Sequence, residues 1–141
     1  MSEDMIEKVC NLWLEPAEFR CIPTSGAIGP DGSAMMDSPI AVEAAKRFAG
    51  IETDLGRLIA ARGNHVHLIR PGLVSFPIKQ FQWSAPTLPV ISRSAQELAA
   101  LVGTAKTLLP RPGVGPGGLN WEDVAKALAA LPDNIIVIQH A

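Results

Sequence analysis

Two kinds of hydrophobic pattern alternate along this chain, and the alternation limits the folds that it can adopt. Short apolar runs such as residues 19–23 are typical of buried strands, whereas Ile40, Ala44 and Phe48 recur every four positions on one helical face. Strand and helix patterns that alternate in this way favour helices on both faces of a sheet. We therefore expect residues 1–141 to form a single α/β domain, with three α/β/α layers around a central mixed sheet.

Glycine, proline and capping residues set the expected ends of these elements. Pro39 can begin a helix without losing a hydrogen bond, and Gly50 can end it. Ser94 and Glu97 have the spacing of a capping box, which predicts that a helix starts there after an irregular stretch at 77–89. Asn120 can cap a last helix. The expected strands are 5–9, 19–23, 66–69, 73–76, 107–109 and 134–138, and those at 66–69 and 73–76 form either a hairpin or two neighbouring strands.

Composition excludes several classes of protein. Of the 141 residues 48% are hydrophobic and 18% are charged, and the formal net charge is −2, which is typical of a globular domain. Because Lys and Arg are scattered, we expect no non-specific nucleic-acid binding.

Cys10 and Cys21 have no zinc-ligand spacing, and His65 and His67 have no evident third ligand, so we expect no metal. No signal peptide or membrane-spanning run is evident, so we expect a cytoplasmic protein that has no cofactor.

A glycine-rich segment lies between a predicted strand and the last predicted helix. It consists of Gly113, Val114, Gly115, Pro116, Gly117, Gly118 and Leu119. Glycine lets backbone amides approach a ligand closely, so such a loop can hold phosphate oxygens. It lacks the Lys-Ser/Thr of a P-loop, and Glu122 and Asp123 disfavour an anion on the axis of the following helix. The residues alone leave two alternatives open, a phosphate cradle and a glycine-rich turn.

Three segments together resemble a macro domain. They are Thr24-Ser25-Gly26 after a predicted strand, the stretch of small residues at 31–39, and residues 110–124. The resemblance extends over nearly the whole chain and is most similar to small bacterial and phage-type members related to ADP-ribose phosphate phosphatases. It implies that a ligand such as ADP-ribose lies in a cleft at the ends of the central strands.

The resemblance also implies a role for individual residues. Asn11 and Leu12 fall near the adenine position, Gly113 to Gly118 wrap the diphosphate, and Leu119 belongs to the same ligand-binding set. The distal ribose faces Thr24, Ser25 and the loop from Met35 to Ser38, which includes Met36. Gly26 belongs to the same ligand-binding set.

The chain departs from the family at the distal side of this cleft. Relatives usually have Asn where this chain has Ser25, and a Gly-x-Gly-like loop where it has Met36-Asp37-Ser38-Pro39. A carboxylate at Asp37 would repel a nearby phosphate, and Pro39 supplies no amide hydrogen. Asp37 is either a general base that activates water or a solvated turn residue.

Three further side chains each have a functional and a structural interpretation. Lys79 either neutralises a phosphate or faces solvent. His140 follows the last expected strand, where relatives often place a residue near the adenine, or it is simply exposed. Trp83 either stacks on a base or packs at the protein surface.

These observations predict that the chain binds ADP-ribose or a related nucleotide, and they leave hydrolysis of an ADP-ribosyl or phosphoester bond open. Two alternatives remain. One is a macro-fold domain that binds another nucleotide signal, and the other is a non-catalytic protein-interaction domain. The residues do not predict the oligomeric state.

Overall fold

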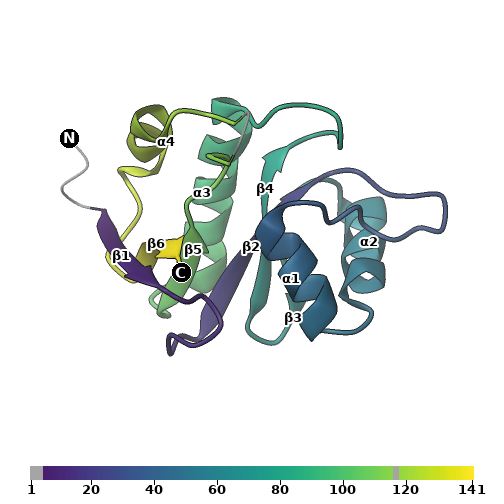
Figure 1. The fold of residues 1–141 in the computed structure, drawn as a ribbon, viewed down its shortest axis with the longest axis horizontal. Coiled ribbons are helices and arrows are strands. Elements are labelled where there is room, and N and C mark those ends of the chain that lie inside the picture. Colours follow the sequence, from purple (N-terminus) through teal and green to yellow (C-terminus); the bar gives the residue numbers. More distant parts are fainter. Residues whose placement is uncertain (1–4, 116–117) are drawn as a thin grey trace.

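The computed structural model describes residues 5–115 and 118–141, in which strands and helices alternate as the hydrophobic pattern predicts (Figure 1). The strands are β1 (Ile6–Cys10), β2 (Phe19–Ser25), β3 (His67–Arg70), β4 (Leu73–Lys79), β5 (Thr107–Pro110) and β6 (Ile135–His140). The helices are α1 (Pro39–Arg47), α2 (Ile51–Arg62), α3 (Leu88–Val102) and α4 (Trp121–Leu128).

The described strands form one mixed sheet in the order β1-β6-β5-β2-β4-β3. All neighbouring pairs are parallel except β3 and β4, which form an antiparallel hairpin. Gly72 lies in the turn of this hairpin with φ of 82°, a backbone conformation that favours glycine. The prediction of a central mixed sheet is confirmed, and of the two arrangements left open for β3 and β4 the hairpin is the one that forms.

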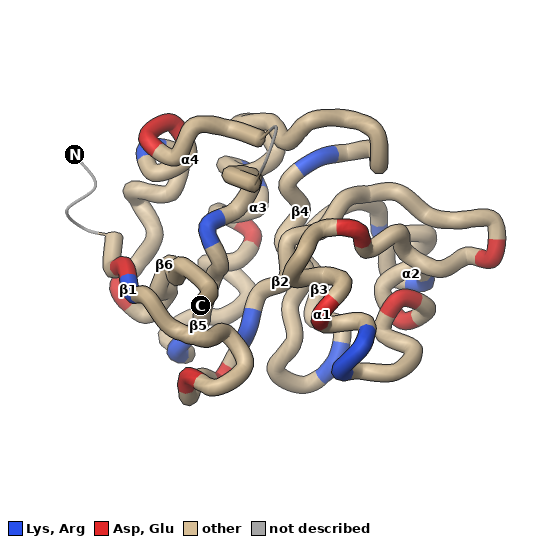
Figure 2. Tube along the Cα trace, viewed as in Figure 1, with Lys and Arg blue, Asp and Glu red and all other residues tan. Residues whose placement is uncertain are grey.

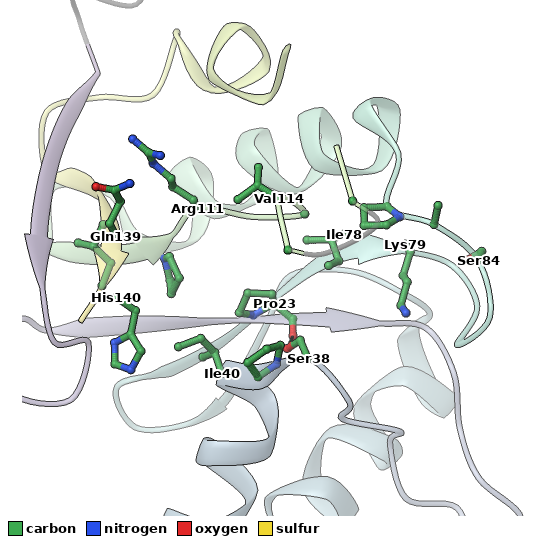
Figure 3. Close-up of a pocket in the computed structure, with 18 of the residues that line it drawn as sticks. Pro23, Ser38, Ile40, Ile78, Lys79, Ser84, Arg111, Val114, Gln139 and His140 are labelled. Carbon is green, nitrogen blue, oxygen red and sulfur yellow. Dashed lines mark hydrogen bonds between the residues drawn. The ribbon is translucent and has the colours of Figure 1, made fainter. Parts of the chain in front are cut away.

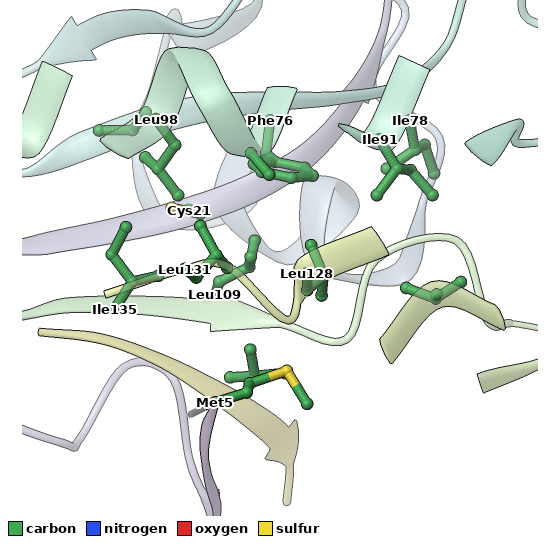
Figure 4. Close-up of a cluster of buried hydrophobic side chains, with 14 of the residues drawn as sticks. Met5, Cys21, Phe76, Ile78, Ile91, Leu98, Leu109, Leu128, Leu131 and Ile135 are labelled. Carbon is green, nitrogen blue, oxygen red and sulfur yellow. The ribbon is translucent and has the colours of Figure 1, made fainter. Parts of the chain in front are cut away.

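Two hydrophobic clusters, one on each face of the sheet, give the fold its three layers. One cluster lies under α3 and α4 and includes Phe76, Leu98 and Leu128 (Figure 4), and the other lies under α1 and α2. Successive strand residues alternate between them. Leu108 joins the α1–α2 cluster and Leu109 the α3–α4 cluster, as the two-residue period of a strand requires.

The third helix begins earlier than its sequence predicts. α3 starts at Leu88 after an extended Thr87, and Ser94 lies inside the helix with its hydroxyl donating to the Pro77 carbonyl oxygen at 2.6 Å. The Glu97 carboxylate accepts from the Val66 amide at 2.9 Å rather than capping α3. The capping-box prediction is wrong because both side chains find partners on neighbouring elements.

β4 also runs further than predicted, through Pro77 to Lys79. A proline cannot donate to a ladder and is tolerated where one side of a strand has no partner. β3 pairs with β4 only as far as Ser75, so Pro77 has no β3 partner and pairs with Thr24 of β2 on its other side. The predicted irregular stretch is therefore reduced to the loop between Lys79 and Leu88.

Charged residues are spread along the fold without a stripe of one sign (Figure 2). Among the described residues, no helix has both the length and the hydropathy that are needed to cross a membrane.

Candidate functional site

A cavity of about 670 Å³ opens at the carboxyl ends of the central parallel strands (Figure 3). Each of four strands contributes the residues at its own end: Pro23 from β2, Ile78 and Lys79 from β4, Pro110 from β5, and Ile138, Gln139 and His140 from β6. Because the carboxyl ends of parallel strands lie at one edge of a sheet, residues far apart in sequence meet there.

The sheet itself creates this cavity. β2 pairs with β5 only through Phe19 with Thr107 and Arg20 with Leu108, both at the amino ends of the strands. Beyond these pairs no register joins the two strands, and Pro23 and Pro110 both line the cavity. After β2 the chain continues to β3 and β4, on the side of β2 away from β5. After β5 it continues to β6, on the side of β5 away from β2. In open α/β sheets, ligands bind at such a change in strand order.

Segments outside the sheet complete the walls. They are the start of α1 (Ser38, Pro39 and Ile40), the loop before α3 (Trp83, Ser84, Ala85 and Pro86), and the glycine-rich loop (Gly113, Val114, Gly115 and Gly118) together with Arg111. Val114 and Ile78 lie on one side of the cavity and Pro23 and Ile40 on the other, with His140 and Lys79 at opposite ends (Figure 3).

Two hydrogen bonds between described residues close the glycine-rich loop on itself. The Leu119 amide donates to the Gly113 carbonyl oxygen at 2.7 Å, and the Gly118 amide donates to that of Gly115 at 2.8 Å. Gly113 has φ of 76°, and a Cβ on Gly118 would collide with the Gly113 carbonyl. Both glycines are therefore required by the backbone. Pro116 and Gly117, which we expect in the same loop, lie outside the described residues.

The glycine-rich loop lines the cavity through Gly113, Val114, Gly115 and Gly118. Among the described residues, no acceptor is paired with the amides of Val114 and Gly115. Leu119 instead packs against the α3–α4 cluster and does not line the cavity.

Ser38 joins the cavity wall to the sheet. Its hydroxyl accepts from the Ala41 amide at 3.2 Å, which caps α1, and donates to the Pro23 carbonyl oxygen at 2.9 Å. Pro39 occupies the first turn of α1, where a missing amide hydrogen costs nothing. Met36 packs against the α1–α2 cluster and is not among the residues that line the cavity.

The Lys79 end of the cavity adjoins an ion pair. The Lys79 Nζ lies 3.9 Å from a carboxylate oxygen of Asp37 and donates to the Gln82 carbonyl oxygen at 2.8 Å. The Lys79 side chain is 16% exposed and lines the cavity, whereas that of Asp37 is 42% exposed and does not. The Lys79 side chain therefore lies in the cavity wall, and the interpretation that it faces solvent is wrong.

The opposite end of the cavity is formed by His140 rather than by Asn11 and Leu12. The Leu12 amide donates to His140 Nδ1 at 3.0 Å, so in the neutral ring the proton lies on Nε2, which is 3.3 Å from Glu43 Oε1. Leu12 itself is fully buried. The Asn11 side chain donates to the Ala141 carbonyl oxygen at 2.9 Å, so it stabilises the chain rather than lining the cavity.

The remaining residues expected near the distal ribose lie behind the wall of the cavity. Thr24 and Ser25 are 6% and 3% exposed, and the Ser25 hydroxyl accepts from the Ala27 amide at 3.2 Å. Gly26 lies against Asn64, with no room for a Cβ. The structure thus brings together Ser38 and the glycine-rich loop from the predicted set, and it does not bring these three to the cavity surface.

The sequence assigned no role to Gln139 and left that of His140 open, and both line the cavity. The local signal that identifies them is their position at the very end of a buried strand, the same signal that identifies Lys79.

Trp83 lines the cavity while 83% exposed, and its ring stacks on Phe81 with centroids 5.2 Å apart. Arg111 also lines the cavity, but its guanidinium lies 4.2 Å from the centroid of the Trp121 ring and donates to Glu7 at 2.9 Å.

Within residues 5–115 and 118–141, no three His, Cys, Asp or Glu side chains group as metal ligands would. The rings of His65 and His67 lie 6.3 Å apart, but each has its own partner: His65 Nδ1 contacts Glu97 at 2.8 Å and His67 Nε2 contacts the Gly63 carbonyl oxygen at 2.9 Å. Complete burial raises the pKa of the Cys21 thiol well above its ordinary value, as expected for a cysteine that packs as an apolar residue.

Comparison with solved structures identifies the fold. The chain is similar to the macrodomain of Mycobacterium tuberculosis DarG, with a TM-score of 0.78, 21% identity and 97% coverage of both chains. It is similar to the macrodomain of Thermus aquaticus DarG, with a TM-score of 0.72, 18% identity, and coverage of 97% of this chain and 98% of that one. A macrodomain protein from Streptomyces coelicolor matches with a TM-score of 0.59 and 14% identity, over 96% and 99% of the two chains.

No protein-family model and no curated protein sequence matches the chain significantly. The structural matches cover nearly the whole chain, so the protein has the macrodomain fold, of the kind found in small bacterial macro domains. The fold predicted from the three resembling segments is confirmed.

Proposed function

We propose that this protein binds ADP-ribose, or a nucleotide derived from it, in the cavity at the carboxyl ends of the central strands. The macrodomain fold supports an ADP-ribose-binding domain in general. The observation that carries the proposal for this chain is the glycine-rich loop, whose backbone at Gly113, Val114 and Gly115 lines the cavity. The volume of about 670 Å³ lies within the range of cavities that bind small molecules.

The cavity offers three chemically different regions to such a ligand. The amides of Val114 and Gly115 suit the diphosphate, because backbone N–H groups hold phosphate oxygens without a nearby cation. Apolar side chains of Pro23, Ile40 and Ile138 line the cavity and suit a base. Since the Leu12 amide is bound by His140, base contacts at this end fall to His140 and Gln139 rather than to Asn11 and Leu12.

A charge placed on the loop tests this arrangement. Among the described residues a Cβ on Gly115 meets no atom within 4 Å, and its φ does not require glycine, so Gly115→Glu changes the charge of the loop without a clash against them. The new carboxylate would repel the diphosphate, and we expect ADP-ribose affinity to fall about tenfold or more by isothermal titration calorimetry. Gly115→Gln has a similar shape and no charge, and it should bind within about threefold of the wild type.

The outcomes separate the alternatives. Equal binding by the Glu and Gln variants would refute the loop as the diphosphate site. Wild-type protein that binds another nucleotide but not ADP-ribose would identify a domain that serves a different nucleotide signal. Wild-type protein that binds no nucleotide would favour the protein-interaction alternative.

Hydrolysis is a second candidate function, and the pairing of Asp37 with Lys79 favours it. We propose hydrolysis at this end of the cavity. Water attacks the phosphorus of a terminal phosphoester or the anomeric carbon of an ADP-ribosyl bond, and Asp37 accepts the water proton. The bond from that atom to the leaving oxygen or nitrogen breaks, so phosphate and ADP-ribose, or ADP-ribose and the freed acceptor group, are released. Lys79 lies where its charge would stabilise the negative charge that develops on the ligand.

Asp37→Asn keeps the shape of the side chain and removes the base. Phosphate release from ADP-ribose 1″-phosphate, or release of ADP-ribose from an ADP-ribosylated substrate, should fall about a hundredfold or more while ADP-ribose affinity is kept. Unchanged turnover would exclude Asp37 as the base, and a wild-type protein without turnover would leave binding as the function.

A further inference from the structure

The end of β4 is irregular at the point where it reaches the cavity. Thr24 of β2 pairs with Pro77, but the next residue, Ser25, pairs with Lys79, so Ile78 is left without a β2 partner. Successive strand side chains normally point to opposite faces, yet Ile78 and Lys79 both line the cavity. A bulge of this kind changes the direction of a side chain, and here it accounts for the direction of Lys79.

The side chain of Asn64 supports this irregular end. Asn64 follows α2 and Gly63, which has φ of 89° and ends the helix. Its amide nitrogen donates to the carbonyl oxygen of Lys79 at 3.0 Å and to Gln80 Oε1 at 2.9 Å. Because both partners are acceptors, the amide orientation is fixed.

Gly26 makes room for this contact. A Cβ on Gly26 would lie 2.8 Å from Asn64 Cγ and 2.9 Å from the Gln80 carbonyl oxygen, to which the Gly26 amide donates at 3.1 Å. The Asn64 amide therefore fits between the end of β2 and the end of β4. Its own Oδ1 is buried and has no hydrogen-bond partner among the described residues. A buried, unpaired oxygen costs free energy, so packing alone does not explain an asparagine here.

The backbone of Asn64 is held from α3. Arg93 donates to the Asn64 carbonyl oxygen at 2.5 Å, and Glu97 accepts from the Val66 amide at 2.9 Å and contacts His65 Nδ1 at 2.8 Å. The turn between α2 and β3 is thus held by α3. The Asn64 side chain joins this turn to the end of β4 through its hydrogen bond to the Lys79 carbonyl oxygen.

We propose that Asn64 is a positioning residue for Lys79, which it holds toward the cavity through the Lys79 carbonyl and Gln80. The inference rests on the proposed function, in which the charge of Lys79 faces the ligand. Asn64 does not line the cavity, so its effect on a ligand passes through Lys79.

Asn64→Asp tests the proposal because it keeps the shape and removes the donor. The carboxylate cannot donate to the Lys79 carbonyl or to Gln80 Oε1. The matched control is Asn134→Asp, because the Asn134 amide also donates to two acceptors, the carbonyl oxygens of Gly103 at 2.8 Å and of Ala105 at 2.9 Å. Neither Asn134 nor its partners line the cavity.

The first readout needs no ligand. In protein labelled with ¹³C and ¹⁵N at lysine, the side-chain NMR signals of Lys79 are assigned by their loss in Lys79→Ala. We expect Asn64→Asp to shift them and Asn134→Asp to leave them in place. Unchanged Lys79 signals in Asn64→Asp would overturn the proposal. If Asn64→Asp does not fold, Asn64→Ser shortens the donor without adding a charge, and the same criterion applies.

The second readout separates positioning from general destabilisation. We expect Asn64→Asp to weaken ADP-ribose binding about tenfold in the wild-type background and less than about twofold in the Lys79→Ala background. An equal loss in both backgrounds would show that Asn64 does not act through Lys79. If the wild type does not bind ADP-ribose, the proposed function fails, and the NMR signals still decide whether Asn64 positions Lys79.

Discussion

Glu97 is a single carboxylate that fixes the turn between α2 and β3. Partial burial raises the pKa of its carboxyl, but hydrogen bonds from the Val66 amide and His65 outweigh that effect. Together with the charge of Arg93, they hold the pKa below its ordinary value of 4.5. A carboxyl whose pKa is lowered by folding stabilises the folded state at pH values above the unfolded pKa, and that contribution is lost as the pH falls through the folded pKa.

Replacement by Gln tests this pH dependence. We expect Glu97→Gln to lower the free energy of unfolding by about 0.5–1 kcal/mol at neutral pH, since the side chain is partly exposed and its charge is screened. The difference from the wild type should shrink as the pH falls below 4.5, because the wild-type carboxyl then becomes protonated. Urea denaturation at several pH values measures it.

The control is Glu18→Gln, which removes an exposed carboxylate that makes no side-chain hydrogen bond within the described part of the chain. A difference for Glu97→Gln that stays constant down to about pH 3 would contradict the interpretation, because it would then arise from packing rather than from charge.

At the scale of elements, the cavity depends on where two helices begin. Asn120 caps α4 after the glycine-rich loop, with its side chain accepting from the Glu122 amide at 3.4 Å, as its sequence position predicts. Ser38 caps α1 and also binds the Pro23 carbonyl oxygen of β2. The start of α1 is therefore bonded to the sheet, whereas among the described residues Asn120 bonds only within its own helix.

This difference predicts unequal costs for the loss of the two caps. Asn120→Ala should lower the free energy of unfolding by about 1 kcal/mol, the usual cost of a lost N-cap. Ser38→Ala should cost about 2 kcal/mol, because it also leaves the Pro23 carbonyl oxygen without its donor. Urea denaturation of both variants measures the costs, and equal values would show that the bond to Pro23 contributes nothing.

At the scale of the whole molecule, the site results from the order of the strands. β2 and β5 are neighbours only at their amino ends, and the chain leaves them toward opposite sides of the sheet. The cavity therefore forms between two strands that are separated in the sequence by α1, α2, the β3–β4 hairpin and α3. Moving either strand in the order would remove the cavity, even with every helix and strand intact.

Local sequence determined the elements and much of one wall of the site. The period of apolar residues identified the strands and the faces of the helices, because that period follows from backbone geometry alone. Local sequence also predicted the helix starts at Pro39 and Asn120 and the glycine-rich loop. Helix caps and left-handed turns need particular residue types within a few positions, so they leave a local signal.

Only the tertiary structure decided which of these residues share the cavity. Ser94 and Glu97 have the spacing of a capping box, but in the structure Ser94 bonds to Pro77 and Glu97 to Val66. Lys79 faces the cavity because a bulge in β4 and the Asn64 side chain set its direction. Leu12 does not line the cavity, and its amide instead donates to His140. Each of these contacts joins segments that are distant in sequence, and periodicity reports only on neighbours along the chain. The strand order that brings such segments together is therefore the part that no local pattern could supply.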